Sequence, residues 1–287
     1  MQSTSRVRFA VCLALLAFEA SSSAQRQLFH QYGSSDGLSN LNVTCLLQDH
    51  TGYLWVGTDN GLFRYDGNAF RGYGHADGLP NAEILSLAEA PTGTLWIGTN
   101  SGVAQATGER FQSVDVGNEG ATRNIGFDST GNVYLEQDDG ILRGVLDSKG
   151  NYRFQTIVSS RVSGLFVHGD YVHFGKDDEL WTLKGGRPQP LDHSYGLPRD
   201  RWGAIAADSL GNLWVRSRTR LYELPHGQAR FIDRSDGIAH AAEAHLYADR
   251  HGSIMVLTSS GIMVLAGNRR TQIDARHGLP ADPSGPC

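Results

Sequence analysis

Residues 52–65 read GYLWVGTDNGLFRY, and a close copy, GTLWIGTNSGV, follows at residues 93–103. Trp96 stands 41 residues after Trp55, so the similarity is an internal repeat and not a bias of composition. Within the first copy, two short runs of β-forming residues flank a glycine-bounded turn, which predicts a hairpin.

The residues on either side of this hairpin complete a four-stranded unit. Upstream, residues 43–48 form another apolar run, and residues 49–52 turn it into the Trp strand, because Asp caps turns and Gly accepts a positive φ. Downstream, residues 69–73 supply a fourth short strand before Asp77-Gly78-Leu79-Pro80 ends the pattern. Four antiparallel strands per roughly 40 residues predict an all-β fold, a β-propeller of four-stranded antiparallel blades.

One column of mostly aromatic residues follows the repeat through its weaker copies. The copies near residues 118–165 are the most degraded, and six complete repeats are visible. We predict that Trp55, Trp96 and Trp214 pack between neighbouring blades and that Gly57 and Gly98 are further structural positions of the repeat. The column steps by 41, 38, 39, 41 and 41 residues through Trp55, Trp96, Tyr134, His173, Trp214 and Met255.

The repeat count leaves one strand over at the start and an unfinished unit at the end. Residues 28–32 match the outermost strand of the first blade at a distance of 41, and His277-Gly278-Leu279-Pro280 opens a further unit. We therefore expect propeller repeats over residues 25–280 and a truncated start of a further repeat, or a tail, over 281–287. Because closure protects sheet edges, the count favours a seven-bladed ring. A six-bladed ring with a loose terminal strand is the alternative.

Residues 1–24 have the pattern of a cleaved secretory signal peptide. Arg6 and Arg8 form the positive region, residues 9–18 are apolar, and Ser22-Ser23-Ala24 places small residues before a cleavage point. The apolar run is about ten residues, and a bilayer span needs roughly 20. We expect a periplasmic or extracellular protein, and an uncleaved anchor is the alternative.

The charge and the cysteines of the mature chain exclude several classes of protein. Removing the signal leaves 23 basic and 29 acidic residues, a net charge of −6 that argues against nucleic acid or an anionic membrane as partner. Cys45 falls in the first inner strand, where Ser86 takes its place one repeat later, so a buried free thiol is expected and not a bridge to Cys287.

The pattern DGL, an inner strand, then D-x-x-G-x-LW-[VI]-G-T-x-x-G-[LV] resembles the repeat of the two-component regulator propeller family. The resemblance covers about residues 28–279 and is strongest in the first two copies. It implies the exported sensor part of a bacterial transmembrane receptor, which senses ligands that are often carbohydrate-derived. It also implies a homodimer through the propeller. The output module, a histidine kinase or diguanylate cyclase, and the membrane segment would lie beyond this chain.

A ligand is expected on the propeller face that carries the DGL linkers and the turns between second and third strands. Polar side chains on loops held by a rigid ring suit a small polar ligand. Trp202, outside the Trp column and beside Arg201, is the candidate for stacking on it. The candidate ligand-binding residues, expected around the mouth of the central channel, are Asp36, Asp59, Asp77, Asn81, Asn100, Arg199, Arg201, Trp202, Asp236 and His240.

Two other functions stay open: a lyase similar to streptogramin lyases, and a protein-interaction scaffold. A lyase would need a His and an acid at the channel mouth, and the pairs available are His240 with Glu243 and His75 with Asp77. No motif assembles a nucleophile and a base. His240 and His245 could ligate a metal, but they are five residues apart and would point to opposite faces of a strand. We therefore expect no enzymatic activity in this chain, no catalytic residues, no cofactor and no metal site.

Overall fold

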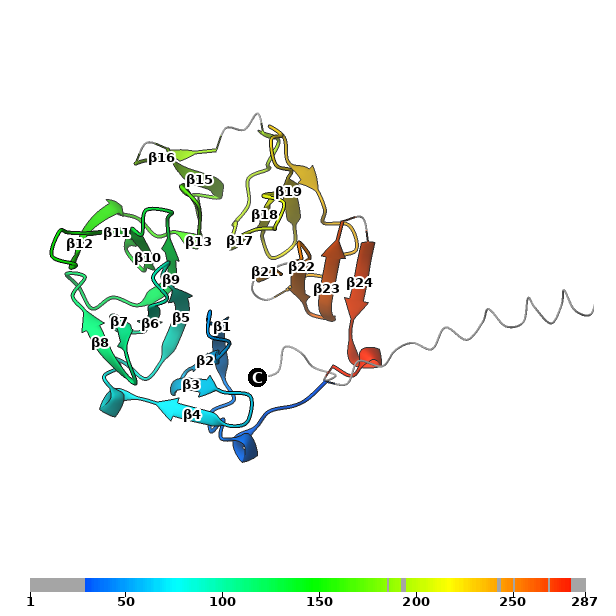
Figure 1. Ribbon diagram of the computed structural model, residues 1–287. Coiled ribbons are helices and arrows are strands. Elements are labelled where there is room, and N and C mark those ends of the chain that lie inside the picture. The colour runs from blue at the N-terminus through cyan, green and yellow to red at the C-terminus, as the bar shows by residue number, and fades with distance from the viewer. Residues whose placement is uncertain are drawn as a thin grey trace, which may run out of the picture.

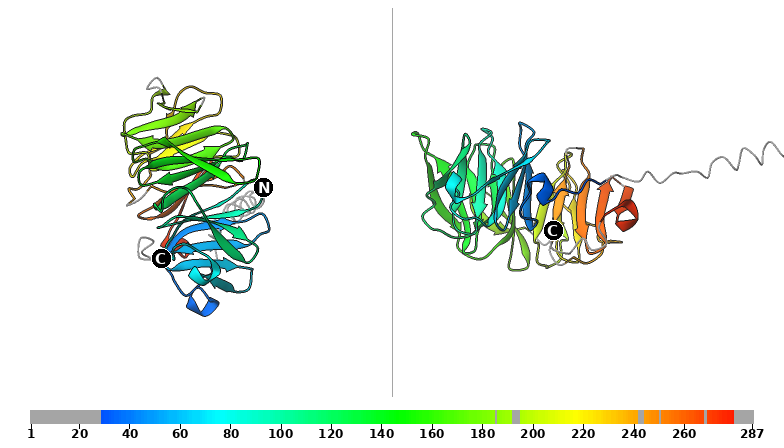
Figure 2. Two further views of the ribbon diagram at one scale, coloured as in Figure 1. Left: turned by 90° about the vertical axis from the view of Figure 1, so that its left-hand side faces the viewer. Right: turned by 90° about the horizontal axis from the view of Figure 1, so that it is seen from below.

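The computed structural model describes residues 29–184, 186–191, 195–241, 244–249, 251–267 and 269–279. It contains six four-stranded antiparallel sheets arranged around a common centre as the blades of a propeller (Figure 1). Seen from the side, the ring is a flattened body in which the strands run between its two faces (Figure 2). The predicted all-β propeller of four-stranded blades is confirmed.

In every blade the strands pair in chain order, from the innermost strand to the outermost. Blades 1 to 3 consist of β1 (Val43–Gln48), β2 (Leu54–Thr58), β3 (Gly61–Tyr65) and β4 (Phe70–Tyr73); β5 (Ile84–Glu89), β6 (Leu95–Thr99), β7 (Val103–Thr107) and β8 (Arg110–Val114); β9 (Thr122–Phe127), β10 (Val133–Gln137), β11 (Gly140–Leu146) and β12 (Tyr152–Val158). Blades 4 to 6 consist of β13 (Ser163–His168), β14 (Tyr171–Lys176), β15 (Glu179–Lys184) and β16 (Arg187–Pro190); β17 (Ala204–Ala207), β18 (Leu213–Arg216), β19 (Leu221–Leu224) and β20 (Ile232–Asp233); β21 (Leu246–Ala248), β22 (Ile254–Thr258), β23 (Gly261–Ala266) and β24 (Arg269–Ile273). Short 3-10 turns lie in linkers at η1 (Ser34–Asp36), η2 (His75–Asp77) and η4 (Ala275–His277).

The core lies between the blades, where the Trp column packs. Trp55, Trp96 and Trp214 are 7%, 1% and 6% exposed. Trp55 of β2 joins one apolar cluster with Ile84 and Ile97 of the next blade. The indole Nε1 of Trp55 also donates to Asp49 Oδ2 at 2.8 Å, so the turn Asp fixes the ring that fills the junction.

The blades contact one another in order through their innermost strands, from β1 to β21. No inner-strand junction of similar extent joins β21 back to β1 in the described part of the chain, and the ribbon is open between blades 6 and 1 (Figure 1). The proposed seventh blade is untested and stays a prediction.

The expected leading strand is wrong for its described part, residues 29–32, which form no strand. The outermost position of every blade is already occupied, in blade 1 by β4 and in blade 6 by β24, so these residues have no strand to pair with. Instead, the Tyr32 ring packs edge-on against Tyr65 and Phe70 of blade 1. The predicted signal peptide and residues 281–287 lie outside the described residues.

Among the helices that the structure describes, none has the length and apolar character needed to cross a bilayer.

Candidate functional site

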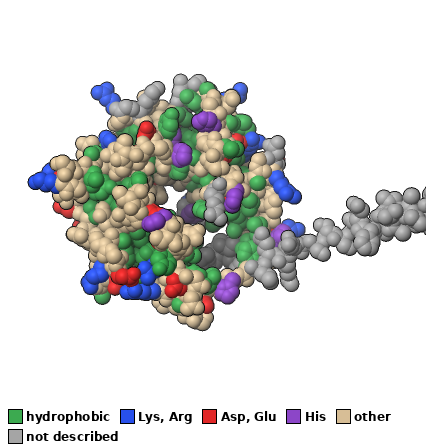
Figure 3. Space-filling view, in the orientation of Figure 1, with side chains coloured by type: hydrophobic (Ala, Val, Ile, Leu, Met, Phe, Trp, Pro, Cys, Tyr) green, Lys and Arg blue, Asp and Glu red, His purple; other side chains and the backbone are tan. Residues whose placement is uncertain are grey.

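The ring encloses a central channel of about 1300 Å³. Residues from all six blades line it, most of them on the innermost strands and on the linkers that enter them. Figure 3 shows the hollow at the centre of the ring. The channel is a concave site lined by all six blades, which makes it the candidate ligand site.

A β-bulge at the start of the inner strand aims one residue of each of the first three blades into this channel. The pairing of β1 with β2, β5 with β6 and β9 with β10 slips by one residue at these positions. The extra residues are Thr44, Leu85 and Arg123, and all three line the channel. Bulges re-aim side chains in this way, and they are often found beside functional sites.

The lining is chemically uneven around the ring. Blades 1, 2 and 6 contribute mainly small or apolar residues with His245, whereas blades 3 to 5 contribute every Arg, Lys, Asp and Glu of the lining. The charged lining residues are Arg123, Glu136, Arg161, Lys176, Asp177, Asp178, Asp200, Arg201 and Arg218.

A glycine column on the second strand explains part of this asymmetry. A Cβ on Gly98 would lie 2.2 Å from Ser86 Oγ and 2.5 Å from the Thr122 carbonyl oxygen, so glycine lets the next inner strand approach closely. Gly57 and Gly175 hold the same place in blades 1 and 4. Blade 3 has Glu136 there, and blade 5 has Arg216.

Glu136 is a buried carboxylate that lines the channel. It is 4% exposed, and its Oε2 accepts hydrogen bonds from Asn124 Nδ2 at 2.7 Å and from the Leu165 backbone N at 2.9 Å. Leu165 lies in the bulge of β13, so the carboxylate satisfies a backbone N–H at an irregular part of the β13–β14 pairing. Desolvation raises the pKa of Glu136, and these hydrogen bonds oppose that shift.

Arg216 is fully buried at the junction of blades 5 and 6. Its Nη1 donates to the carbonyl of His245, a channel residue, at 2.9 Å. Its Nε and Nη2 have no hydrogen-bond partner among the described residues, and desolvation lowers the pKa of Arg216 to about 10. Arg216 therefore helps to position the start of the blade 6 inner strand. Sequence reasoning missed both Glu136 and Arg216, although each breaks the Gly column two residues after the Trp column.

The loops of blades 4 and 5 form a charged network at one mouth of the channel. Asp177 and Asp178 both adopt the left-handed conformation, with φ of 53° and 58°. Asp200 N donates to the Asp178 carbonyl at 2.9 Å, and the Asp178 carboxylate lies 3.6 Å from Arg201 Nε. The two aspartates form the two-residue turn between β14 and β15, a hairpin geometry that requires a positive φ at both central positions.

Of the ten predicted ligand-binding residues, Arg201 and Trp202 line the channel. The Arg201 side chain is 94% exposed, as a ligand-binding role requires. The stacking role of Trp202 is wrong for this structure, because the residue is 1% exposed and packs with Leu180, Val215 and Phe231. The Trp202 backbone carbonyl accepts a hydrogen bond at 3.0 Å from Ser163 Oγ, which belongs to another residue of the channel wall.

The linker aspartates do not surround the channel mouth, which corrects the prediction for Asp36, Asp77 and Asp236. Asp36 and Asp77 cap 3-10 turns by accepting from the backbone N of the residue three positions earlier, at 2.8 and 2.9 Å. These turns lie against the outermost strand of the next blade: a Cβ on Gly78 would lie 2.0 Å from the Phe111 carbonyl oxygen. The DGL segments are thus at the rim of the ring. Asp236 is fully exposed and is 3.9 Å from Arg270 of the outermost strand β24.

The other five predicted residues also lie outside the channel lining. Asp59 accepts from the side-chain amides of Asn40 and Asn42 at 2.7 and 2.6 Å. Asn81 accepts from the Glu83 backbone N, and Arg199 donates to Glu179 at 2.6 Å. Asn100 and His240 are exposed on the face of the turns between second and third strands, since Asn100 lies in such a turn and the His240 carbonyl accepts from Ser259 N at 3.2 Å.

The two His and acid pairs are not assembled by the described residues. His75 Nδ1 is 2.9 Å from the Leu79 carbonyl oxygen, at the rim with Asp77. Glu243, the partner expected for His240, lies outside the described residues. In the part of the chain that the structure describes, no three His, Cys, Asp or Glu side chains are grouped as a metal site. Cys45 is a free thiol in the channel wall, and burial raises its pKa to about 11.

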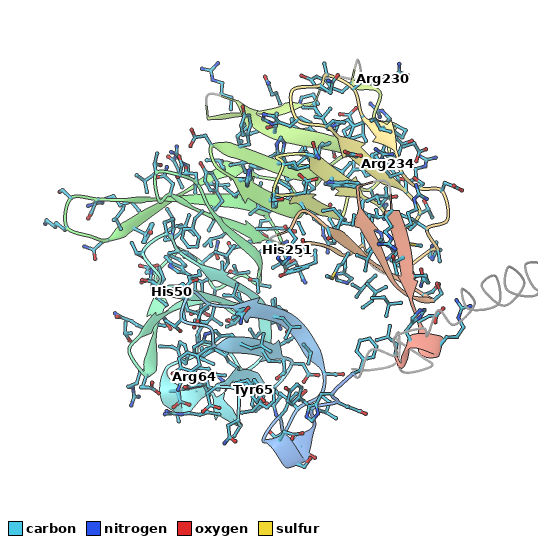
Figure 4. All side chains as sticks on the ribbon, turned by 45° about the vertical axis from the view of Figure 1, so that its right-hand side comes forward. His50, Arg64, Tyr65, Arg230, Arg234 and His251 are labelled. Atoms are coloured by element: carbon cyan, nitrogen blue, oxygen red, sulfur yellow. The ribbon has the colours of Figure 1, made fainter. Side chains whose placement is uncertain are left out.

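A second group of charges lies on the outside of the ring. Arg64 of blade 1, labelled in Figure 4, and Arg71 both pair with Glu109 of blade 2. The Arg64 guanidinium also lies over the ring of Tyr53, 4.5 Å from its centroid. These charges pair with one another, and the ion pairs link blade 1 to blade 2.

Two segments of the chain, residues 37–60 and 78–101, match the two-component regulator propeller family. The resemblance drawn from the repeats is confirmed at these two copies. Histidine kinase P4 of Formosa agariphila is 36% identical over 61 residues, which are 21% of this chain and 4% of that protein. The chain therefore matches only a small part of this curated relative.

Solved structures share the fold. The extracellular domain of the putative one component system BT4673 from B. thetaiotaomicron superposes with a TM-score of 0.66 at 17% identity, covering 82% of this chain and 34% of that one. The extracellular domain of the putative hybrid two component system BT3049 from the same organism gives 0.66 at 17% identity, covering 85% and 36%. Virginiamycin B lyase from Staphylococcus aureus gives 0.68 at 13% identity, covering 85% and 87%. The chain spans about a third of the two sensor domains, and at these identities the likeness concerns the fold alone.

Proposed function

We propose that this chain, which carries two-component regulator propeller repeats, is the exported ligand-sensing propeller of a bacterial signal-transduction receptor. The observation that carries the proposal is the channel of about 1300 Å³, lined by residues from all six blades. Pockets of about 300–1,000 Å³ hold small ligands, so the channel is large enough for a small polar, carbohydrate-derived molecule. A ligand there touches several inner strands at once, so its binding energy can bias how the blades, or two paired propellers, pack.

The comparisons support this reading at the level of the domain. The same fold is the extracellular domain of two sensor systems, and a histidine kinase shares a 61-residue segment. The proposal places the chain in the periplasm or outside the cell after cleavage of residues 1–24, and it allows a homodimer through the propeller. Membrane contact and the output domain would belong to a region beyond Cys287. The chain itself would carry no catalysis and need no cofactor.

Ligand binding in the channel can be tested by thermal unfolding of the purified chain with a panel of oligosaccharides, sugar acids and amino acids. A ligand at a free concentration of 100 times its Kd stabilises the folded state by about 2.7 kcal/mol. This raises the melting temperature by roughly 5–10 °C for a protein of this size. Thr44→Trp places a bulky ring at an exposed channel position, and Thr156→Trp places it on the outermost strand β12 as the matched control. The proposal expects loss of binding with the first variant alone. Equal binding by both variants, or no stabilising molecule in the panel, would contradict it.

The receptor role has its own test. Reading the coding DNA past the codon for Cys287 should show an open frame with a membrane segment and a kinase or cyclase domain. A stop codon at that point would favour a free exported propeller, a scaffold or an enzyme instead.

A further inference from the structure

We infer that the channel takes a hydroxylated ligand with an acidic group, whose anion is bound by Arg161 and one of whose hydroxyls donates to Glu136. The inference rests on the proposed function, because it assigns a chemical class to the ligand of the same channel. Two observations carry it: an unpaired guanidinium and a buried carboxylate with a free oxygen, both in the charged half of the channel wall.

Arg161 lies in the linker between β12 and β13, exposed at the channel wall. Of the other lining cations, Arg123 pairs with Asp138 at 2.8 Å, Lys176 pairs with Asp177, and Arg201 lies 3.6 Å from Asp178. Arg161 has no ion-pair or hydrogen-bond partner among the described residues.

The aspartates of the lining are engaged by other groups. Asp177 pairs with Lys176, and Asp178 lies 3.6 Å from Arg201 Nε. The Asp200 carboxylate is engaged by the Arg201 backbone N and by Ser217 Oγ, both at 2.8 Å. A planar guanidinium binds a carboxylate or a sulfate with two parallel hydrogen bonds, and it does so best where solvent is partly excluded. The charged half of the wall is therefore complementary to an anion.

Glu136 supplies an acceptor in the same half of the wall. Both hydrogen bonds that it receives from the described residues end on Oε2, which leaves Oε1 without one. A carboxylate oxygen at the edge of a cavity accepts from a hydroxyl or an ammonium group. Because the anion subsite needs a negatively charged ligand, a hydroxyl of that ligand is the matching donor.

The opposite wall selects the body of the ligand. Leu85, Leu87, Ala244 and Leu246 line the side formed by blades 1, 2 and 6. A pyranose ring presents a C–H face to such residues and directs its hydroxyls and acidic group to the other side. An inorganic anion would leave these apolar contacts unused, so an acidic saccharide fits the whole wall better.

The test is isothermal titration of the purified chain with four named probes: trigalacturonate and a chondroitin sulfate disaccharide, which differ in the source of the anion, and maltotriose and cellobiose as neutral probes. We expect at least one acidic probe to bind ten-fold or more tightly than both neutral ones. Arg161→Ala should weaken that probe at least ten-fold, while Arg161→Lys retains part of the affinity. Arg153→Ala, an exposed arginine on β12, is the control and should leave it unchanged.

Glu136→Gln tests the hydroxyl subsite without emptying the junction, since its amide oxygen can still accept from Asn124 and Leu165. It should weaken acidic and neutral probes by the same factor, with an unchanged melting temperature as the check on folding. Preference for a neutral probe, or an Arg161→Ala variant with wild-type affinity, would overturn the inference and leave the proposed function standing. Failure of all four probes would count against both.

Discussion

Blade 4 lacks a contact that fixes the column residue in other blades, and this has a measurable consequence. Trp214 Nε1 donates to Asp208 at 3.1 Å, and the Tyr134 hydroxyl donates to Asp128 at 3.0 Å. In blade 4 the turn Asp is missing, and the column residue is His173. It is 9% exposed, and its Nδ1 has no partner among the described residues. Desolvation lowers the pKa of His173 to about 4, and the nearby His168 adds to the shift.

The sign of the effect on stability follows from proton binding. Between pH 6.5 and 4 the unfolded chain binds a proton at this histidine and the folded chain does not, so the free energy of unfolding rises with pH through this window. With one group shifted from 6.5 to about 4, linkage gives a loss of about 1 kcal/mol at pH 6 and about 2 kcal/mol at pH 5, relative to pH 7.5. The buried neutral imidazole thus makes blade 4 acid-sensitive.

Urea unfolding followed by tryptophan fluorescence at pH 7.5, 6 and 5 measures this term. His173→Phe keeps an aromatic ring in the column and removes the proton site, so its stability should exceed that of the wild type by about 2 kcal/mol more at pH 5 than at pH 7.5. His226→Gln, at an exposed position on blade 5, should keep the wild-type pH dependence. Parallel pH profiles for the wild type and His173→Phe would refute the reasoning.

Three further outcomes are expected. Gly98→Ala should cost about 2–3 kcal/mol in urea unfolding, because its Cβ meets the Thr122 carbonyl oxygen at 2.5 Å, whereas Gly74→Ala, with no atom within 4 Å of its Cβ, should be near neutral. Asp128→Ala should cost about 2–3 kcal/mol at pH 7, because it removes the acceptor for Thr130, Asn132 and Tyr134. Desolvation of Asp128 is outweighed by these hydrogen bonds, which lower its pKa, so the difference between wild type and this variant should shrink as the pH falls below about 3.8. Size-exclusion chromatography should show an oligomer at micromolar concentration, because large apolar side chains are exposed on blades 1 and 6. Leu46, Tyr247 and Leu257 are 61%, 61% and 45% exposed. A strictly monomeric peak would contradict this.

The blade pattern could be predicted from the sequence because the same local signals for strands and turns recur in each copy. The Trp55 column, the Asp49 turn and the glycine-bounded hairpin together predicted strands that the structure has within about a residue of the expected positions. The expectation failed for residues 29–32, because a strand needs a partner and every outer position was already taken. Local pattern alone does not show whether a partner is free.

The ligand site was less predictable, because a propeller separates residues radially as well as by face. The DGL linkers do lie on the face of the second-to-third-strand turns, since Asp59 N donates to the Asn42 carbonyl at 3.2 Å and Asn100 N to the Glu83 carbonyl at 3.0 Å. However, the linker begins at the rim and reaches the channel only a few residues later. Face assignment from the order of strands therefore selected Asp36 and Asp77 at the rim, and it missed Arg161, which enters the channel two residues before β13.

The charged residues of the channel lie in blades 3 to 5, and the packing between blades explains why. A glycine in the second strand, as at Gly57 and Gly98, lets neighbouring blades close on one another, and it leaves no side chain at that place. Replacing it by Glu136 or Arg216 inserts a charged group that must be held by the next blade through Leu165 N or the His245 carbonyl. Burying a charged group in a core costs free energy unless the group is hydrogen-bonded. In blade 3 this substitution replaces the close glycine packing by a polar side chain, Glu136, in the channel wall. Blades 3 to 5 lie outside the two segments that match the family, and they carry every Arg, Lys, Asp and Glu of the channel lining, so ligand recognition is expected there.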